Sequence, residues 1–206
     1  MDSGTGRQTK RVEHSLKILM LGDSGAGKTS LLVRFSQNAF NPAYITTIGI
    51  DILNKKINLA DQVINLKIWD TAGQERYQTL TKQFFVNVDG IVLVLNLLSL
   101  ESFKHLEKWL DLIKNQGEQQ NLDIIIAGNK CDCDEDEKAV EPKDIETFVE
   151  ANNLIYLETS AKTGINVEKL FQTLTKRILK RKGIKLESRQ SIMIHQQPKQ
   201  KKRKCC

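Results

Sequence analysis

Residues 22–29 read Gly22-Asp23-Ser24-Gly25-Ala26-Gly27-Lys28-Thr29, and they lie between an apolar run at 16–21 and a second apolar stretch at 31–35. The first run predicts a strand and the second predicts the beginning of a helix. The glycines allow left-handed backbone angles, so that successive N–H groups can converge on one anion at the positive end of a helix. This strand–loop–helix arrangement is typical of a phosphate-binding loop.

The polar residues of this loop suit a polyphosphate and its metal ion. Lys28 is placed to reach the β- and γ-phosphates of a nucleotide, and the Thr29 hydroxyl is placed to coordinate Mg²⁺. The alternative is a glycine-rich turn that carries a surface lysine. The loop by itself predicts a nucleotide but does not select one.

The basic charge of the chain is concentrated at its C-terminal end. The 206 residues carry a net charge of +6. Residues 180–206 contain ten Lys and Arg against one acidic residue, a net +9, so residues 1–179 carry −3. The net charge therefore does not indicate a basic, nucleic-acid-binding folded domain, although a nucleic-acid binder that uses the basic tail remains an alternative.

Targeting signals are few. No segment approaches the about 20 consecutive apolar residues that a membrane-spanning helix needs. The first fifteen residues are polar and lack the apolar centre of a signal peptide, so we expect an intracellular protein. Asp2 follows the initiating methionine, which excludes N-myristoylation there. Four cysteines, two of them at the very end, do not make a disulfide framework.

Strands and helices are predicted to alternate along the chain. Besides the strand at 16–21 and the helix at 28–35, we expect strands at 50–59, 63–69, 90–95, 122–127 and 154–157, and helices at 99–116, 142–151 and 167–179. The strands at 50–59 and 63–69 read as an antiparallel hairpin. The pattern predicts an α/β fold with a six-stranded, mostly parallel sheet, one antiparallel edge strand and helices on both faces. Ligands of such sheets bind beyond the carboxyl ends of the strands.

Asn129-Lys130-Cys131-Asp132 directly follows the expected strand at 122–127 and glycine 128. A carboxylate at Asp132 can accept hydrogen bonds from N1–H and the 2-amino group of guanine. Adenine offers neither donor at these positions, so it would leave a buried carboxylate unpaired, which is costly. Taken alone, this short pattern more often marks an exposed polar turn.

Five motifs, in this order, resemble those of Ras-like small GTPases and, among these, the Rab family. They are the loop at 22–29, Thr46-Thr47-Ile48-Gly49, the stretch Trp69 to Glu75, Asn129 to Asp132, and Glu158-Thr159-Ser160-Ala161-Lys162. The resemblance covers about residues 16–180 and implies a P-loop small GTPase fold for them. It implies a flexible N-terminal extension at 1–15 and a disordered basic tail at 181–206.

The resemblance also implies a site for GTP or GDP with Mg²⁺. The residues implied to bind the nucleotide are Asp23, Ser24, Gly25, Ala26, Gly27, Lys28, Thr29, Ser30, Phe40, Tyr44, Thr47, Gly73, Asn129, Lys130, Asp132, Ser160, Ala161 and Lys162. The implied metal site consists of Thr29, Thr47 and, through water, Asp70. The implied catalytic residues are Gln74, which would orient the attacking water, and Lys28.

A slow GTP hydrolase that works as a switch is the implied activity. Segments 36–48 and 70–82 would be ordered by GTP and loosened after hydrolysis. Intrinsic rates in this class are roughly 10⁻⁴ to 10⁻³ per second, and the sequence shows no obvious arginine committed to the γ-phosphate. The implied effector surface comprises Ile48, Gly49, Ile52, Trp69 and Phe84. Ile52 departs from the usual phenylalanine of Rab proteins, Phe84-Phe85 from a Tyr-Tyr pair, and Asn96 from an Asp-containing segment.

The tail ends in Cys205-Cys206 after a basic cluster at 199–204. This is not a C-a-a-X box, but it resembles the Cys-Cys ending of Rab proteins, which implies geranylgeranylation of both thiols. Two lipids and a basic cluster give stable membrane association. A nuclear localisation run or a solvated tail is the alternative.

The resemblance therefore implies a monomeric switch in vesicle-mediated transport that does not bind nucleic acid. It would sit on the cytoplasmic face of an intracellular membrane or the plasma membrane and cycle with the cytosol. Implied partners are an exchange factor, a GTPase-activating protein, chaperones of prenylated Rab proteins, and effectors. The alternatives are a Ras-like GTPase in signalling and a P-loop ATPase or kinase. His14, His105 and His195 form no recognisable catalytic set.

Overall fold

The computed structural model describes residues 13–42, 47, 49–71, 84–115 and 122–186, and the structural statements below concern these residues. The strands are β1 (Glu13–Leu21), β2 (Ile50–Leu59), β3 (Gln62–Thr71), β4 (Gly90–Asn96), β5 (Asp123–Asn129) and β6 (Ile155–Thr159). The helices are α1 (Lys28–Gln37), α3 (Leu100–Asn115), α4 (Pro142–Ala151) and α5 (Val167–Arg181), with a short 3₁₀ helix η2 (Glu135–Glu137).

The strands form one sheet in the order β2-β3-β1-β4-β5-β6. β2 pairs with β3 in antiparallel register, and the other four neighbouring pairs are parallel. The alternating apolar pattern of β2 and β3 suits their position at one side of the sheet, whereas β4 is buried along nearly its whole length. The predicted six-stranded, mostly parallel sheet with one antiparallel edge strand is therefore confirmed.

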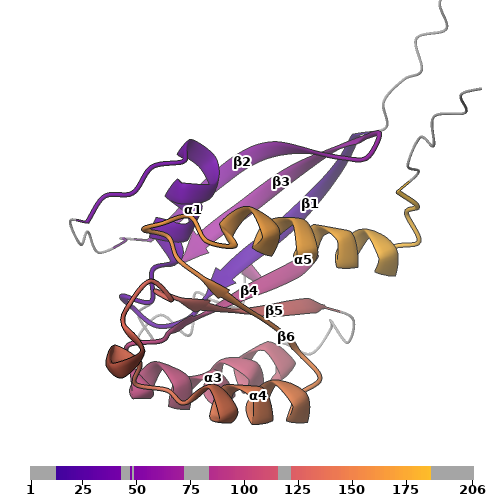
Figure 1. The fold of residues 1–206 in the computed structure, drawn as a ribbon. Helices are drawn as coiled ribbons and strands as arrows, with labels where there is room; N and C mark the ends of the chain where they lie inside the picture. The colour runs from indigo at the N-terminus through magenta and orange to yellow at the C-terminus, as the bar shows by residue number, and fades with distance from the viewer. Residues whose placement is uncertain (1–12, 43–46, 48, 72–83, 116–121, 187–206) are drawn as a thin grey trace, which may run out of the picture.

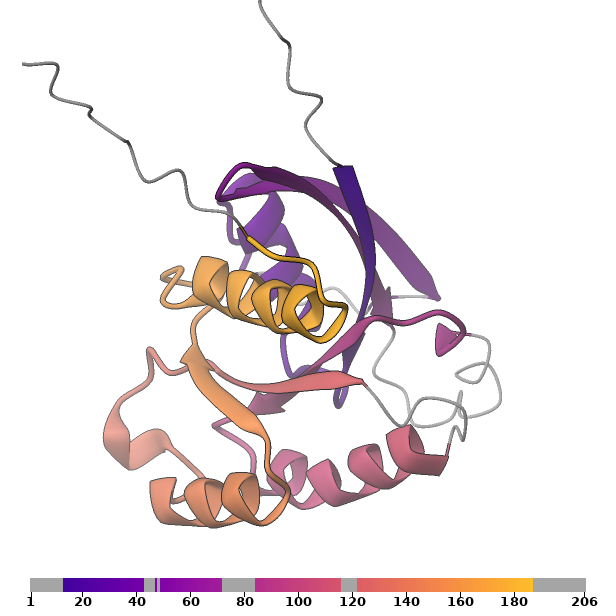
Figure 2. The same cartoon turned by 90° about the vertical axis from the view of Figure 1, so that its right-hand side faces the viewer.

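Helices cover both faces of the sheet, as predicted (Figures 1 and 2). α1 and α5 enclose one apolar core, in which the rings of Phe35 and Phe171 stack with 4.0 Å between their centroids. α3 and α4 enclose the second core through Leu106, Leu110 and Ile145. These two cores hold the sheet rigid, so the loops at its edges start from fixed positions. In the described part of the chain, no helix is both long enough and apolar enough to cross a bilayer.

Element boundaries differ from the predicted ones by a few residues. α4 begins where predicted because Pro142 occupies its first turn. It also ends at the predicted residue, Ala151. β5 continues past the predicted end at 127, because Gly128 and Asn129 still pair with β4 and β6. β1 begins at Glu13, inside the predicted 1–15 extension, because Glu13, His14 and Ser15 pair with β3.

The C-terminal end of the described chain also extends past the predicted domain boundary at 180. After α5, Ile184 and Leu186 pack against the core beside α1 and α5. The side chain of Gln62, at the β2–β3 turn, donates a hydrogen bond to the carbonyl oxygen of Lys185 across 2.7 Å. Because Val63 pairs with Glu13, the first and last described residues lie at the same end of the sheet.

The opposite end of the sheet carries the candidate motifs. The five strands that run parallel to one another all end there, at Leu21, Thr71, Asn96, Asn129 and Thr159. The loops that follow them start from one edge of the sheet, which is where ligands of such folds bind.

Candidate functional site

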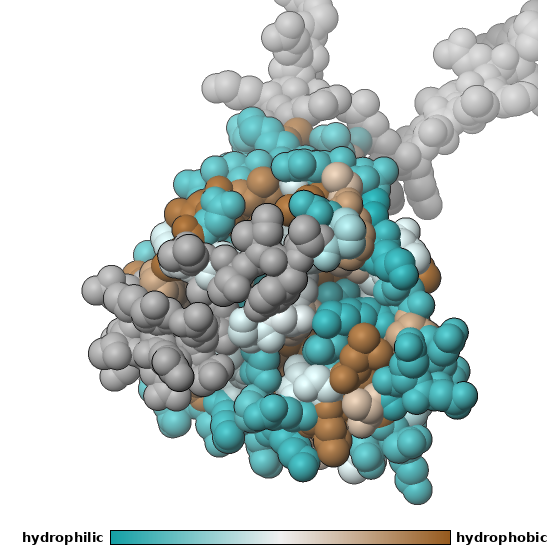
Figure 3. All heavy atoms as spheres, turned by 90° about the vertical axis from the view of Figure 1, so that its left-hand side faces the viewer, coloured by the Kyte–Doolittle hydropathy of each residue, from teal (hydrophilic) through white to brown (hydrophobic). Residues whose placement is uncertain are grey.

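A cavity of about 930 Å³ opens at this edge. Figure 3 faces it and shows mostly hydrophilic described residues, with small hydrophobic groups between them. Thirteen of the predicted nucleotide-binding residues line the cavity: Ser24, Gly25, Gly27, Lys28, Thr29, Ser30, Phe40, Thr47, Asn129, Lys130, Asp132, Ala161 and Lys162. Residues from four loops far apart in the sequence therefore share one cavity.

The loop at 22–29 owes its path to close approaches that only glycine permits. Gly27 has φ +93°, and a Cβ atom there would collide with the side-chain amide of Asn129. Gly22 has φ +132°, and a Cβ atom there would collide with the Val94 carbonyl oxygen of β4. The loop therefore lies directly against β4 and β5, with its backbone facing the cavity.

Lys28 is the buried cation of the site. Only 5% of the residue is exposed, and its Nζ donates to the carbonyl oxygens of Gly22 and Asp23 at 2.8 and 2.9 Å. Burial lowers the pKa of Lys28 to about 8, although the carboxylates of Asp70 and Asp23 oppose this shift. Added phosphate charge at the cavity would stabilise the protonated form.

Three oxygen-bearing side chains meet beside Lys28. The Thr29 hydroxyl donates to Oδ2 of Asp70 at 2.5 Å and lies 2.7 Å from the hydroxyl of Thr47. Asp70 is fully buried, and its Oδ1 has no hydrogen-bond partner among the described residues. Burial raises the pKa of Asp70, while Thr29 and Lys28 oppose the rise. A hard divalent cation such as Mg²⁺ prefers hydroxyl and carboxylate oxygens as ligands, and Asp70 Oδ1 has no hydrogen-bond partner among the described residues. The three side chains therefore suit such an ion.

Asn129 joins three of the loops. Its side-chain amide donates to the carbonyl oxygen of Ala26 at 2.9 Å, and its Oδ1 accepts from the backbone N–H of Ala161 at 3.2 Å. Arg34 of α1 reinforces the same junction by donating to the carbonyl oxygens of Ala161 and Lys162. These hydrogen bonds thus fix the loop at 22–29 to the end of β5 and to the loop after β6.

Asp132 is oriented by the loop after β6. The hydroxyl of Ser160 donates to its Oδ1 at 2.6 Å, and Nζ of Lys162 lies 3.5 Å from its Oδ2. Burial disfavours ionisation of this carboxyl, but the hydrogen bonds from Ser160, the backbone and Lys162 outweigh it, so the pKa of Asp132 lies below its ordinary value. The result is an oriented, ionised acceptor beside the cavity.

Three predicted nucleotide-binding residues lie next to the cavity without lining it. Ala26 and Ser160 are buried, and they support Asn129 and Asp132, respectively. Asp23 turns its carboxylate toward α3, where His105 and Trp109 bond to it. Tyr44, Ile48, Gly73, Gln74, Cys205 and Cys206 lie outside the described residues.

The predicted effector surface is partly described. Ile52 is 46% exposed and lies opposite Trp69 in the β2–β3 ladder, while Gly49 is exposed nearby in sequence. The ring centroid of Phe84 lies 6.1 Å from that of Trp69. Ile52, Trp69 and Phe84 therefore come together although they belong to different parts of the chain.

Some residues at the site were not predicted from the sequence. Leu98, Cys133, Asp134 and Glu137 line the cavity, and Leu98 comes from the loop between β4 and α3. Leu98 follows the buried strand predicted at 90–95, and this position could have indicated that it lies at the ligand-binding edge of the sheet. His105 and Trp109 lie one helical turn apart, which puts them on one face of α3, but nothing in the sequence points to Asp23 as their partner.

Comparison with known proteins identifies the class. A family model described as "Ras family" matches residues 17–180. The chain is 42% identical over 180 residues to the Ras-related protein Rab-10 of Diplobatis ommata, covering 86% of this chain and 88% of the relative. It is 41% identical to the GTP-binding protein ypt2 of Schizosaccharomyces pombe (84% and 86% covered) and 37% identical to the Ras-related protein Rab-13 of Rattus norvegicus (84% and 85%).

The chain belongs to the Ras family. Within it, the protein is a Rab-like small GTPase, a GTP hydrolase, and the predicted resemblance is confirmed.

Proposed function

We propose that this protein is a membrane-anchored switch in vesicle-mediated transport, which binds GTP or GDP with Mg²⁺ at the cavity described above. One observation carries the nucleotide assignment: Lys28, Thr29 and Asp132 line one cavity, and Asp70 bonds to Thr29 beside it, although these residues come from separate parts of the sequence. The Rab-like relatives support the transport role.

In the proposed complex, the phosphates lie along the loop at 22–29. Its N–H groups and the N-terminus of α1 attract anions, and Lys28 supplies a full positive charge. In the described structure, the Lys28 ammonium is already held by the carbonyl oxygens of Gly22 and Asp23. The lysine is therefore preorganised, so little side-chain entropy is lost when phosphate binds.

The base lies between Asp132, Lys130 and Ala161. The Asp132 carboxylate accepts N1–H and the 2-amino group of guanine, and Ser160 keeps it in the required orientation. The N–H of Ala161 donates to the guanine carbonyl oxygen, and Phe40 packs at the edge of the base. This arrangement rejects adenine because adenine would cover the Asp132 carboxylate without donating a hydrogen bond to it.

The hydroxyls of Thr29 and Thr47 and, through water, Asp70 would hold Mg²⁺, and the lack of a partner for Asp70 Oδ1 among the described residues supports this role. The ion would neutralise charge on the β- and γ-phosphates. Thr47 belongs to one predicted switch and Gly73 to the other, so loss of the γ-phosphate would remove a contact from each. Gln74 orients the attacking water, and hydrolysis without an activating protein is slow.

Membrane attachment is the remaining part of the proposal. Geranylgeranyl groups on Cys205 and Cys206, together with the basic cluster at 199–204, would hold the protein on the cytoplasmic face of a membrane. Exchange factors, activating proteins and chaperones of the lipidated form would move it between cytosol and membrane. Effectors would bind the surface around Ile52, Trp69 and Phe84 in the GTP-bound state.

The deciding experiment is a titration of the purified protein with GDP and with ADP in Mg²⁺ buffer. We expect GDP to bind and ADP to bind at least about 10²-fold more weakly, since the site pairs buried polar groups with guanine. The variant Asp132→Asn should lose most of the GDP affinity, whereas Asp136→Asn, an exposed change in the neighbouring loop, should keep it. Equal or tighter binding of ADP would refute the proposal.

A further inference from the structure

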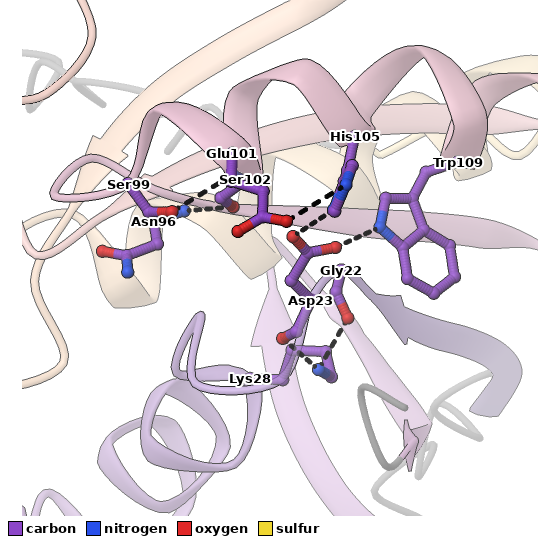
Figure 4. A network of polar contacts seen from close by, with 9 residues as sticks. All are labelled: Gly22, Asp23, Lys28, Asn96, Ser99, Glu101, Ser102, His105 and Trp109. Carbon is purple, nitrogen blue, oxygen red and sulfur yellow. Dashed lines mark hydrogen bonds and ion pairs between the residues drawn. The ribbon is translucent and has the colours of Figure 1, made fainter. Parts of the chain in front are cut away.

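The side chain of Asp23 is held by helix α3 rather than by the cavity. Trp109 Nε1 donates to Oδ1 of Asp23 at 2.9 Å, and His105 Nδ1 lies 2.8 Å from Oδ2 (Figure 4). Both carboxylate oxygens are thus engaged. A carboxylate can only accept hydrogen bonds, so Nδ1 of His105 is the donor and carries a hydrogen. The contact is shielded, because only 17% of the Asp23 side chain and 25% of the His105 side chain are exposed.

The backbone of the same residue contacts Lys28. The carbonyl oxygen of Asp23 accepts hydrogen bonds from Lys28 Nζ at 2.9 Å and from the N–H of Ala26 at 3.3 Å. Asp23 therefore links α3, on one side, to the phosphate-binding cation on the other. Figure 4 shows Asp23 between the side chains of α3 and Lys28.

Helix α3 is a rigid support for this link. Leu106 and Leu110, beside His105 and Trp109 in sequence, are buried in the second core. The beginning of the helix is tied to the end of β4, because the Ser102 hydroxyl accepts from the N–H of Asn96 at 3.1 Å. A donor on α3 thus has a fixed position relative to the sheet edge.

We propose that His105 and Trp109 are positioning residues for the phosphate-binding loop: their hydrogen bonds to the Asp23 carboxylate hold the loop in the arrangement that retains the nucleotide. Among the described residues, the charged groups facing His105 are Asp23 from the loop and Glu101 from one turn earlier in α3, whose Oε1 lies 3.8 Å from Nε2. Beyond Asp23 lies the ammonium of Lys28.

The two donors hold one carboxylate between them, and hydrogen bonds to a charged acceptor are stronger than neutral ones. Loss of either donor would leave one carboxylate oxygen of Asp23 without its partner on α3 and let the loop move relative to this helix. The carbonyl oxygens of Gly22 and Asp23, which hold the Lys28 ammonium, would move with the loop. We therefore expect faster nucleotide release when a donor is removed.

The test measures release of a fluorescent GDP analogue from the full chain at one neutral pH and at constant ionic strength and Mg²⁺. His105→Leu removes the donor, so release should be about 5-fold faster, at the lower end of typical coupling between sites. His105→Asn retains a donor close to the position of Nδ1 and should release GDP at nearly the unchanged rate.

Two more variants separate positioning from general stability. Trp109→Phe keeps an aromatic ring in the same place and removes only the donor, so release should be several-fold faster. Glu107→Gln, an exposed change on the same helix, should release GDP at the unchanged rate. Thermal unfolding of each GDP-loaded variant checks that it is folded.

The inference is overturned if His105→Leu or Trp109→Phe releases GDP at the unchanged rate, or if His105→Asn releases it as fast as His105→Leu. It rests on the proposed position of the phosphates at Lys28, but the two can fail separately. If the unchanged protein does not bind GDP, the proposed function fails. If it binds GDP and the variants do not differ from it, only the inference fails.

Discussion

The side-chain amide of Asn129 donates a hydrogen bond to the carbonyl oxygen of Ala26, which lies 103 residues earlier in the sequence. The same side chain accepts from the N–H of Ala161, and only 1% of Asn129 is exposed. One amide therefore satisfies two buried backbone groups in two different loops of the cavity. The shape of the nucleotide site and the stability of the fold consequently depend on the same side chain.

Replacing Asn129 by alanine should lower both stability and nucleotide affinity. The change leaves the carbonyl oxygen of Ala26 and the N–H of Ala161 without partners, which costs about 2 kcal/mol or more. Urea unfolding of the nucleotide-free protein measures this loss. Asn58→Ala, an exposed change in β2, is the control and should cost much less. A free energy of unfolding equal to that of the control would contradict the role given to Asn129.

Nucleotide affinity should fall as the pH rises above about 8. Burial lowers the pKa of Lys28 to about 8 in the protein without nucleotide. Phosphate favours the protonated form, so binding must take up a proton once Lys28 has lost its own, and affinity then falls by up to about ten-fold per pH unit. Calorimetry of GDP binding at pH 9 in two buffers of different ionisation enthalpy should reveal the proton uptake.

The same lowered pKa has the opposite effect on the empty protein. The unfolded chain holds the Lys28 proton more tightly than the folded one, so folding is opposed most strongly below pH 8. This opposition declines as the pH rises from about 8 toward 10.5, the ordinary lysine value. In the calorimetry described above, GDP binding at pH 9 without proton uptake would show that Lys28 remains charged in the nucleotide-free protein.

Gln74→Leu should slow GTP hydrolysis without loss of binding. The role of Gln74 in orienting water rests on the resemblance, and an aliphatic side chain cannot make that contact. We expect the single-turnover rate to fall by roughly ten-fold or more, because phosphoryl transfer depends mainly on positioning. Gln78→Leu in the same segment serves as the control. An unchanged hydrolysis rate in Gln74→Leu would rule out this role.

Changing both Cys205 and Cys206 to serine should leave the protein in the soluble fraction of cells. Serine hydroxyls do not accept the proposed lipids, and a basic cluster without lipid holds a membrane only weakly. Fractionation of cells that express a tagged chain measures the distribution. The double change Ser188→Ala and Ser191→Ala, in the same tail, keeps both terminal thiols and should not alter membrane pelleting. Pelleting of the Cys205/Cys206 variant would exclude lipidation as the anchor.

The sequence predicts elements whose pattern is local. The run at 90–95 is apolar on both faces and became the buried strand β4, and Pro142 marked the beginning of α4. The end of β5 was harder to predict, because Gly128 and Asn129 are extended through pairing with neighbouring strands rather than by their own preference. Periodicity thus gives the order of elements, while tertiary pairing sets their ends.

In the candidate site, too, residues of local motifs could be predicted, whereas contacts between distant parts of the chain could not. Lys28, Thr29 and Asp132 belong to short motifs whose chemistry can be interpreted from residue type, and they line the cavity. Asp23 belongs to the same motif, yet its carboxylate points to α3. Its partner His105 lies 82 residues away, and neither the spacing nor the residue type predicts that contact.

The contact between Gln62 and Lys185 fixes the last described residues at the end of the sheet opposite the cavity. Twenty residues follow Leu186, and a chain of that length cannot reach further than about 70 Å. With lipids at its tip, this tail would keep the domain within one such distance of the bilayer, and it would be attached at the end of the domain opposite the nucleotide edge. A regulator could then reach the nucleotide without displacing the lipid anchor.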